Sequence, residues 1–459
     1  MKNFSKLFFI QLFLVCALIS VGQKNTNGFT SLFDGKTFTG WKKLAGSADY
    51  KIENGMIVGT TVLSSPNTFL ATEKEYGDFV LELEVKIEDT TANSGIQFRS
   101  HFNQAANDGK GKVYGYQYEL DPSSRRWTAG IYDEGRRDWF YPLSLNAKAQ
   151  SAFKLGQFNK VHIECIGNEL KTWINNVPAA YVVDTADAKG FIALQVHSIG
   201  TNTKFVGEKI YWKNIRIKTG NIIPTPFPGD VYVQNNIPNF LCNYEKNSGW
   251  KLLFDGVSNT GWRGAYKTGF PKKGWQIDNG LLTVLSSEGK EGGNGGDIVT
   301  TDMYSVFDLS FEFKLTPGAN SGVKYFVTLN ENNQGSAIGL EYQVLDDALH
   351  PDAKLGRDGD RTLASLYDLI PAPKQPRFVH KIGDWNTGRI IVYPNNHVEH
   401  YLNGIKVLEY ERGSQPFRDL VAISKYKIWP NFGEAKEGHI LLQDHGNEVS
   451  FRSIKIKPL

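Results

Sequence analysis

The chain has 459 residues, which is too long for one typical domain and suggests two or three. Hydrophobic residues make up 41% and aromatic residues 13% of the chain, so general disorder is excluded. The formal net charge of +3 leaves no basic excess of the kind that nucleic-acid-binding proteins carry, and we expect no nucleic-acid partner.

The first elements along the chain predict a signal peptide over residues 1–22. Lys2 and Lys6 precede an apolar run over residues 7–19, and small residues stand before Gln23. The run is too short to span a bilayer comfortably, so we expect an exported protein without a membrane span, in the periplasm or cell envelope. A lipoprotein anchored at Cys16 is the alternative, but the residues before it lack the small side chains expected there.

The remainder of the chain contains the same domain twice. Residues 31–42 read SLFDGKTFTGWK and residues 252–263 read LLFDGVSNTGWR, and further matching phrases follow in the same order. We place the first copy at residues 28–218 and the second at 249–459. Residues 219–248 carry four prolines and no regular period, which is typical of a linker.

Both copies show the period-two pattern of β-strands. In FVLELEVKI (79–87) and FDLSFEFKL (307–315) every second residue is apolar, and several later segments alternate in the same way. Gly and Asn separate these segments, as hairpin turns require. Many antiparallel strands in about 200 residues predict an all-β fold, with two stacked sheets in each copy forming a sandwich or jelly roll.

Two sequence features bear on architecture rather than on chemistry. We interpret the repeated Asp-Gly as a turn and Trp41 and Trp262 as buried anchors of the first strand. Cys165 and Cys242 could pair after export, although support for a disulfide is weak, and no cysteine spacing indicates zinc.

The ordered motifs resemble one family. NSGIQFRS, GYQYELD and GIYDEGRR in the first copy, with NSGVKYF, LEYQVLDD and GHILLQDHG in the second, are similar to 3-keto-disaccharide hydrolase-like domains. The resemblance implies two tandem concanavalin-like jelly rolls acting on 3-keto-glycosides or 3-keto-disaccharides, by elimination or net hydrolysis. The partner it implies is a carbohydrate or glycoside, and we expect a monomer.

Strand alternation selects candidate residues in the first copy. Gln97 and Arg99 are expected on one strand face, with Gln117, Glu119 and Asp121 on one face of the next predicted strand. The imidazole of His197 is a candidate base. Arg99, Glu119 and His197 are therefore the predicted catalytic residues, and the predicted substrate-binding residues are Gln97, Gln117, Asp121, Tyr132, Glu134 and Arg137. A solvated polar sheet face with ion pairs is the alternative.

The second copy carries a different set at the aligned positions. Lys324 replaces Gln97, Glu341 replaces Gln117, and His445 aligns with His197, which predicts a second catalytic site with rearranged roles. A structural ion pair between Lys324 and Glu341 is the alternative. The predicted substrate-binding residues of this copy are Gln343, Asp346 and Tyr367.

Two further possibilities remain open at this stage. The loop over residues 346–361 is rich in Asp and could hold a divalent cation, although it lacks the full EF-hand spacing and an exposed acidic loop is the alternative. Trp127, Trp139 and Tyr141 could stack on sugars or could pack in the core.

Alternatives to a two-site enzyme are a tandem carbohydrate-binding protein without catalysis, or one active domain beside one degenerate domain.

Overall fold

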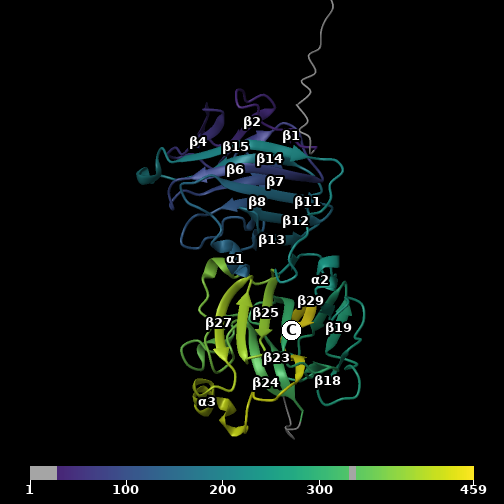
Figure 1. Ribbon diagram of the computed structural model, residues 1–459. Coiled ribbons are helices and arrows are strands. Elements are labelled where there is room, and N and C mark those ends of the chain that lie inside the picture. The colour runs from purple at the N-terminus through teal and green to yellow at the C-terminus, as the bar shows by residue number, and fades with distance from the viewer. Residues whose placement is uncertain (1–27, 330–336) are drawn as a thin grey trace, which may run out of the picture.

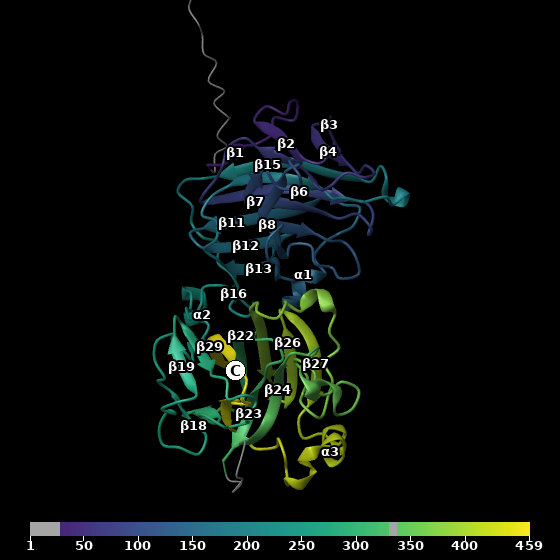
Figure 2. The same ribbon diagram turned by 180° about the vertical axis from the view of Figure 1, so that it is seen from behind.

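The computed structural model describes residues 28–329 and 337–459, so the predicted signal peptide lies outside the described residues. The chain folds into two β-rich domains stacked one above the other, with the linker between them (Figures 1 and 2). Each domain contains two sheets, which confirms the predicted all-β tandem architecture.

Two sheets form the first domain, and their strands are antiparallel except for the linker strand β16. Sheet 1A joins, in spatial order, β16 (Gln234–Asn235), β13 (Val177–Val183), β12 (Glu169–Ile174), β11 (Asn159–Ile166), β6 (Phe79–Ile87), β15 (Lys209–Lys218), β4 (Met56–Thr60) and β3 (Asp49–Glu53), and β1 (Thr30–Ser31) pairs with β15. Sheet 1B joins β10 (Asp138–Tyr141), β9 (Ile131–Glu134), β8 (Lys112–Leu120), β7 (Ser94–Asn103), β14 (Phe191–Val196), β5 (Thr68–Thr72) and β2 (Trp41–Ala45). The linker strand β16 is parallel to β13.

The second domain repeats this plan with fewer strands. Sheet 2A joins β19 (Trp275–Asp278), β20 (Leu281–Val284), β29 (Val449–Pro458), β22 (Phe307–Leu315), β25 (Asn386–Val392), β26 (His397–Leu402) and β27 (Ile405–Glu411), and β17 (Lys251–Leu252) pairs with β29. Sheet 2B joins β18 (Trp262–Gly264), β21 (Ile298–Thr300), β28 (His439–Leu442), β23 (Asn320–Thr328) and β24 (Ile338–Leu345).

Helices are short and lie in connections. The α-helices are α1 (Ala147–Gln150), α2 (Asn243–Asn247) and α3 (Gln415–Ala422). The 3₁₀ helices are η1 (Leu143–Leu145), η2 (Thr203–Phe205), η3 (Pro351–Lys354), η4 (Pro376–Phe378) and η5 (Lys425–Ile428). Across the described ranges, no helix combines the length and the apolar character needed to cross a bilayer.

The apolar side chains at every second strand position form the core of each domain. Phe79, Leu81, Leu83, Val85 and Ile87 of β6 all point between the sheets and are buried, as their alternation predicts. Burial of each such side chain contributes roughly 1.5–3 kcal/mol. Asn54 and Gly55 join β3 to β4 with positive φ angles of 51° and 76°, the combination that two-residue hairpin turns need.

The repeated opening phrase has the same structural role in both copies, as predicted. Asp34 accepts hydrogen bonds from the backbone N–H groups of Lys36 and Thr37, each at 2.7 Å. The buried Trp41 donates its indole N–H to the carbonyl of Leu32 at 2.7 Å. Asp255 and Trp262 make the corresponding contacts in the second copy, so the phrase closes a turn and pins the first strand.

The linker packs against both domains. Besides β16, it contains α2, where Glu245 accepts from Asn235 at 2.6 Å and pairs with Lys455 of β29 at 2.5 Å. The guanidinium of Arg389 lies 4.0 Å from the ring centre of Tyr232. The linker residues therefore cover part of the outer face of sheet 2A.

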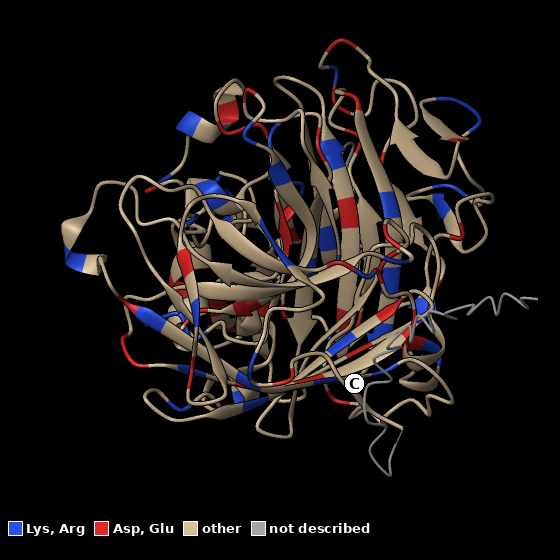
Figure 3. Cartoon of the chain, turned by 90° about the horizontal axis from the view of Figure 1, so that it is seen from above, with Lys and Arg blue, Asp and Glu red and all other residues tan. Residues whose placement is uncertain are grey.

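Cys165 and Cys242 do not pair. Cys165 lies in the main core of the first domain and Cys242 in a smaller cluster at the linker, and both are free and buried. The suggested disulfide is therefore absent from the structure. Lys and Arg are interspersed with Asp and Glu along the strands and loops (Figure 3), in keeping with the small net charge.

A candidate active site in the second domain

The outer face of sheet 2B carries the polar residues predicted in the second copy. Lys324 on β23 stands opposite Glu341 on β24, and Gly322 stands opposite Gln343. The alternate residues Val323, Tyr325 and Tyr342 point into the core. Strand alternation therefore presents Lys324, Glu341 and Gln343 together on the side away from the core.

Two long loops turn this face into a pocket. Residues 346–365 separate β24 from Leu366, and residues 412–438 separate β27 from β28. The corresponding connections of the first domain are shorter, with residues 121–130 between β8 and β9 and residues 184–190 between β13 and β14. The pocket has a volume of about 350 Å³. It is lined by Glu291, Asn320, Lys324, Ala337, Ile338, Gly339, Glu341, Gln343, His350, Pro351, Asp352, Leu355, Tyr367, Lys425, Tyr426, Trp429, Gln443 and His445.

The charged pair at the base of the pocket is buried but loosely joined. The Nζ atom of Lys324 lies 3.9 Å from Oε2 of Glu341 and donates to the carbonyl of Ala337 at 3.3 Å. The exposed fractions of Lys324 and Glu341 are 5% and 4%. A separation this long leaves both groups able to bind a third, which is unlike a tight structural ion pair.

Hydrogen-bonding capacity in this pocket is incomplete. Within the described residues, the buried atoms Oδ1 of Asn320, Oε1 of Gln443 and Nδ1 of His445 have no hydrogen-bond partner. Buried polar atoms are normally paired, because an unpaired one costs about 1–3 kcal/mol. Three such atoms around one pocket indicate groups arranged to meet a polar ligand.

Several lining residues were not predicted from the sequence. Asn320 and Gln443 share the face of Lys324, and strand alternation around these motifs could have identified them. His350 and Lys425 come from the two long loops, and no local pattern marks them. Burial lowers the pKa of Lys425, although Glu341 opposes that effect, and burial beside His445 lowers the pKa of His350.

Tyr367 lies in the pocket as predicted, but Asp346 does not line it. The phenol of Tyr367 donates to Asp352 at 2.8 Å. Asp346 is buried and accepts from the backbone N–H groups of Gly318 and Ala348, so its role is to shape a turn. The prediction that Asp346 contacts substrate has no support from this geometry.

In the Asp-rich loop over residues 346–361, carboxylates bind partners within the same loop. Asp352 pairs with Arg361 at 2.9 Å, and Asp360 accepts from the backbone N–H of Arg357 at 2.9 Å. In the described ranges, the group of side chains close enough to share a metal ion is His397, Glu399 and Glu409, which lies outside this loop.

The matching face of the first domain carries a chain of amides. Gln97 donates to Gln117 at 2.5 Å, and Gln117 and Asn93 donate to the two carboxylate oxygens of Glu119 at 2.9 and 2.8 Å. Burial raises the pKa of Glu119 to about 7, against the effect of these two hydrogen bonds. Gln97, Gln117 and Glu119 therefore share one face as predicted, with Gln97 at the position of Lys324.

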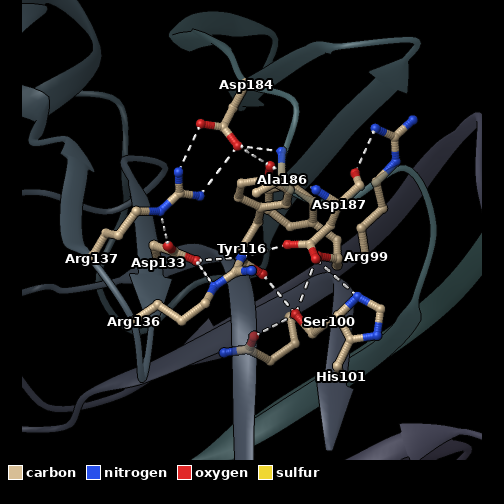
Figure 4. Close-up of polar contacts among 12 residues, drawn as sticks. Arg99, Ser100, His101, Tyr116, Asp133, Arg136, Arg137, Asp184, Ala186 and Asp187 are labelled. Carbon is tan, nitrogen blue, oxygen red and sulfur yellow. Dashed lines mark hydrogen bonds and ion pairs between the residues drawn. The ribbon is translucent and has the colours of Figure 1, made fainter. Parts of the chain in front are cut away.

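Arg99 does not join that face, which corrects the prediction. A β-bulge follows Phe98, and Arg99 has a φ of +46°, so the alternation breaks at this residue. Its buried guanidinium donates to the carbonyls of Gly77 and Gly167 at 2.9 and 2.7 Å and pairs with Asp78 at 3.0 Å. In Figure 4 it lies away from the Arg136–Asp133 group. Arg99 therefore ties loops together and is not placed for catalysis.

A network of ion pairs holds Arg137. It pairs with Asp133 at 2.6 Å and Asp184 at 3.0 Å, beside Arg136, which bridges Asp133 and Asp187 (Figure 4). Asp133 is fully buried. This network joins β9 to the loop before β14 and accounts for Arg137 structurally.

The remaining candidates of the first domain border the face of Gln117 and Glu119. Tyr132 stands opposite Gln117, and the charges of Asp121 and Glu134 add to the raised pKa of Glu119. His197 is half-buried, its Nδ1 is 2.7 Å from the carbonyl of Ser198, and burial lowers its pKa. Asn67 donates to Glu134 at 3.2 Å. Tyr132 donates to Asp138 at 2.7 Å, and Asp121 pairs with Arg125 at 2.8 Å.

The aromatic residues considered as sugar platforms are largely internal. Trp127 and Tyr141 are buried, with exposed fractions of 6% and 0%. Trp139 is half-buried and packs against Trp127 with ring centres 4.7 Å apart. Trp127 also contacts Phe378 of the second domain at 5.5 Å. These rings fill the core and the domain interface.

The chain is similar to several known proteins. A protein from Bacteroides thetaiotaomicron named 3-keto-disaccharide hydrolase is 39% identical over 232 residues, which are 46% of this chain and 79% of the relative. A solved structure from Parabacteroides distasonis, described as a candidate glycosyl hydrolase, is 29% identical with a TM-score of 0.42, covering 48% of this chain and 99% of that one. Residues 28–218 and 249–457 both match the model of one domain family. The chain therefore belongs to the 3-keto-α-glucoside-1,2-lyase-like domain family, with two copies of its domain.

Proposed function

We propose that the second domain cleaves the glycosidic bond of glycosides whose C3 hydroxyl has been oxidised to a ketone, by elimination or net hydrolysis. A glycoside hydrolase-like role follows from the family and from the relative's name. The observation that supports the finer proposal is one pocket lined by Lys324, Glu341 and His445 and by buried polar atoms that have no hydrogen-bond partner.

The chemistry needs a base, a cation and an acid. A ketone at C3 makes the C2 hydrogen acidic, because its removal leaves an enolate. The electron pair of the C2–H bond first forms the enolate. When the C3 carbonyl is restored, that pair forms the C1–C2 double bond and the C1–O bond breaks. The leaving oxygen takes up a proton. Addition of water to the unsaturated product at C1 then gives net hydrolysis.

The pocket supplies a residue for each task. His445, with its unpartnered Nδ1, is the base that takes the C2 proton. The ammonium group of Lys324 stabilises the negative charge that develops on the C3 oxygen. The carboxylate of Glu341, 3.9 Å away, keeps Lys324 in its charged form. Lys425, whose pKa is lowered by burial, donates a proton to the leaving oxygen. Asn320 and Gln443 accept hydrogen bonds from sugar hydroxyls through their free oxygens.

We propose that the first domain does not perform the same step. Its face has Gln97 where the second copy has Lys324, and Arg99 is directed elsewhere. An amide dipole stabilises an enolate oxygen less than an ammonium group does. This assignment corresponds to one active and one degenerate copy.

Single-residue variants of the full protein test the assignment. With a 3-keto-disaccharide as substrate and the unoxidised disaccharide as control, we expect His445→Ala to lower kcat/KM about 10²–10⁴-fold. His197→Ala, the matched change in the first copy, is expected to leave kcat/KM within about threefold. Equal losses in both variants would show two working sites, and binding without turnover in the unaltered protein would favour a carbohydrate-binding protein.

We also propose that the protein acts after export, as a monomer. The leader-like residues 1–22 support export. Fractionation of the native host with an antibody to the second domain tests the location, and light scattering of the purified chain tests the oligomeric state. Recovery in the cytoplasmic fraction, or a stable dimer, would reject the respective statement.

A further inference from the structure

Besides the pocket of the second domain, the protein has a cavity in the first domain, on the outer face of sheet 1A. Glu119 lies on the opposite side of this sandwich. The volume of the cavity is about 740 Å³, within the range of small-molecule sites. A single row of residues crosses the sheet beneath it. Strand pairing aligns them in the order Trp173, His162, Glu82, Arg216 and Ser31.

The same row in the second domain is covered by the linker. There the aligned residues are Tyr401, Arg389, Ser310, Lys455 and Leu252. The ring of Tyr232 lies over Arg389 at 4.0 Å, and its hydroxyl is 3.4 Å from Oγ of Ser310. The row in sheet 2A therefore receives a flat ring with a hydroxyl group, supplied by the chain itself.

Neighbouring residues fix the polar side chains of the first-domain row. The carboxylate of Glu82 accepts from Arg216 at 2.5 and 2.8 Å and lies 3.2 Å from Nδ1 of His162. The other ring nitrogen of His162 is 3.1 Å from Glu164, which is buried and also binds the linker residue Thr225. Such support orders the groups before a ligand arrives and reduces the entropy cost of binding.

Rings of the chain cover the two ends of this row, with Phe227 packed on Trp173 at 5.2 Å and Phe29 over Arg216 at 4.7 Å, but the polar side chains between them are still partly accessible. The exposed fractions of Glu82, His162 and Arg216 are 28%, 25% and 45%. Asn214 and Asn176 add amides to the lining, and Asn214 donates to Glu84 at 2.7 Å. The acidic residues Glu82 and Glu84 are balanced by Lys160 and Arg216. A balanced lining favours an uncharged ligand over an anion or a cation.

We propose that this cavity binds an uncharged saccharide, as a site separate from the pocket of the second domain. A sugar ring offers what Tyr232 offers to the equivalent row, a flat face with hydroxyl groups. Planar carboxylate, guanidinium, imidazole and amide groups can each engage neighbouring hydroxyls. The inference does not depend on turnover in the second domain, because it rests on another face of another domain.

Calorimetric titration of the full chain with maltotriose, cellotriose and mannotriose tests the proposal, with trigalacturonate as the charged control. We expect at least one neutral trisaccharide to bind with a Kd below 1 mM and trigalacturonate to bind at least tenfold more weakly. Arg216→Ala and, separately, Asn214→Ala should weaken binding at least tenfold. Lys209→Ala is the matched control, since Lys209 lies on the same strand and pairs with Glu53, and neither residue lines the cavity.

The outcomes separate this site from the pocket of the second domain. His445→Ala should leave trisaccharide binding within twofold, and Arg216→Ala should leave turnover of a 3-keto-disaccharide unchanged. Loss of binding in His445→Ala alone, or no binding of any neutral trisaccharide, would overturn the proposal. So would binding of a synthetic peptide with the sequence of residues 228–250 that is lost in Arg216→Ala, because the cavity would then dock a protein segment.

Discussion

Lys324 stands directly opposite Glu341 on the neighbouring strand, with its ammonium nitrogen 3.9 Å from the carboxylate. In the first copy the matching residues are Gln97 and Gln117, whose amides are hydrogen-bonded at 2.5 Å. One strand pairing thus holds a loosely joined charged pair in one domain and a closed amide pair in the other. This difference separates the expected roles of the two copies.

Lys324→Gln, which installs the first copy's residue in the second, is expected to lower kcat on a 3-keto-disaccharide about 10²–10³-fold. The reason is loss of the cation that stabilises the enolate oxygen. Lys324→Arg keeps the charge and should recover part of the rate. Steady-state kinetics with matched circular dichroism spectra measure the effect, and an unchanged kcat in Lys324→Gln would remove Lys324 from the mechanism.

Glu119 is expected to make the first domain less stable as the pH rises. Its pKa is raised from 4.5 to about 7 by burial, so between these values the unfolded chain releases the proton while the folded one retains it. Stability therefore falls from about pH 4.5 to pH 7 and then levels off, with a full contribution on the order of 3 kcal/mol. Thermal unfolding across this pH range should show a smaller decrease for Glu119→Gln. The same decrease in both proteins would assign it to other groups.

Arg99→Ala is expected to destabilise the first domain by about 2–4 kcal/mol without affecting turnover. The guanidinium, itself buried, donates to the backbone carbonyls of Gly77, Gly167 and Asp187 and pairs with Asp78. Its removal leaves these acceptors without their partner and a cavity in its place. Scanning calorimetry of the full chain should show an unfolding transition at lower temperature. A loss of activity at a temperature where the variant is still folded would return Arg99 to the list of catalytic candidates.

Glu245→Ala is expected to destabilise the contact between linker and second domain by about 3–5 kcal/mol. The change leaves the ammonium group of Lys455 buried without its partner at 2.5 Å. The double variant Glu245→Leu with Lys455→Met removes both charges and should recover most of the loss. Urea unfolding of the single and double variants measures this, and additive losses would show that the two side chains are not coupled.

The sequence by itself determined the repeated domain, the sandwich and the faces of its strands. The alternation in residues 79–87 and 307–315 is local, and burying one side of such a strand admits one orientation. For the same reason Lys324, Glu341 and Gln343 could be assigned to one face before the structure was known, and the Asp-Gly turn followed by a tryptophan could be assigned to architecture.

Only the tertiary structure decided where that local pattern fails and what covers each sheet. The bulge that turns Arg99 away depends on the pairing of β7 with its neighbours, which the strand's own residues do not encode. His350 and Lys425 reach the pocket of Glu341 from two loops, so their presence there depends on contacts between segments that are far apart in the sequence. The linker places Tyr232 on sheet 2A, whereas over sheet 1A it leaves a cavity that its own residue Thr225 helps to line. Such packing between distant segments depends on complementary surfaces, which the period of a strand does not encode.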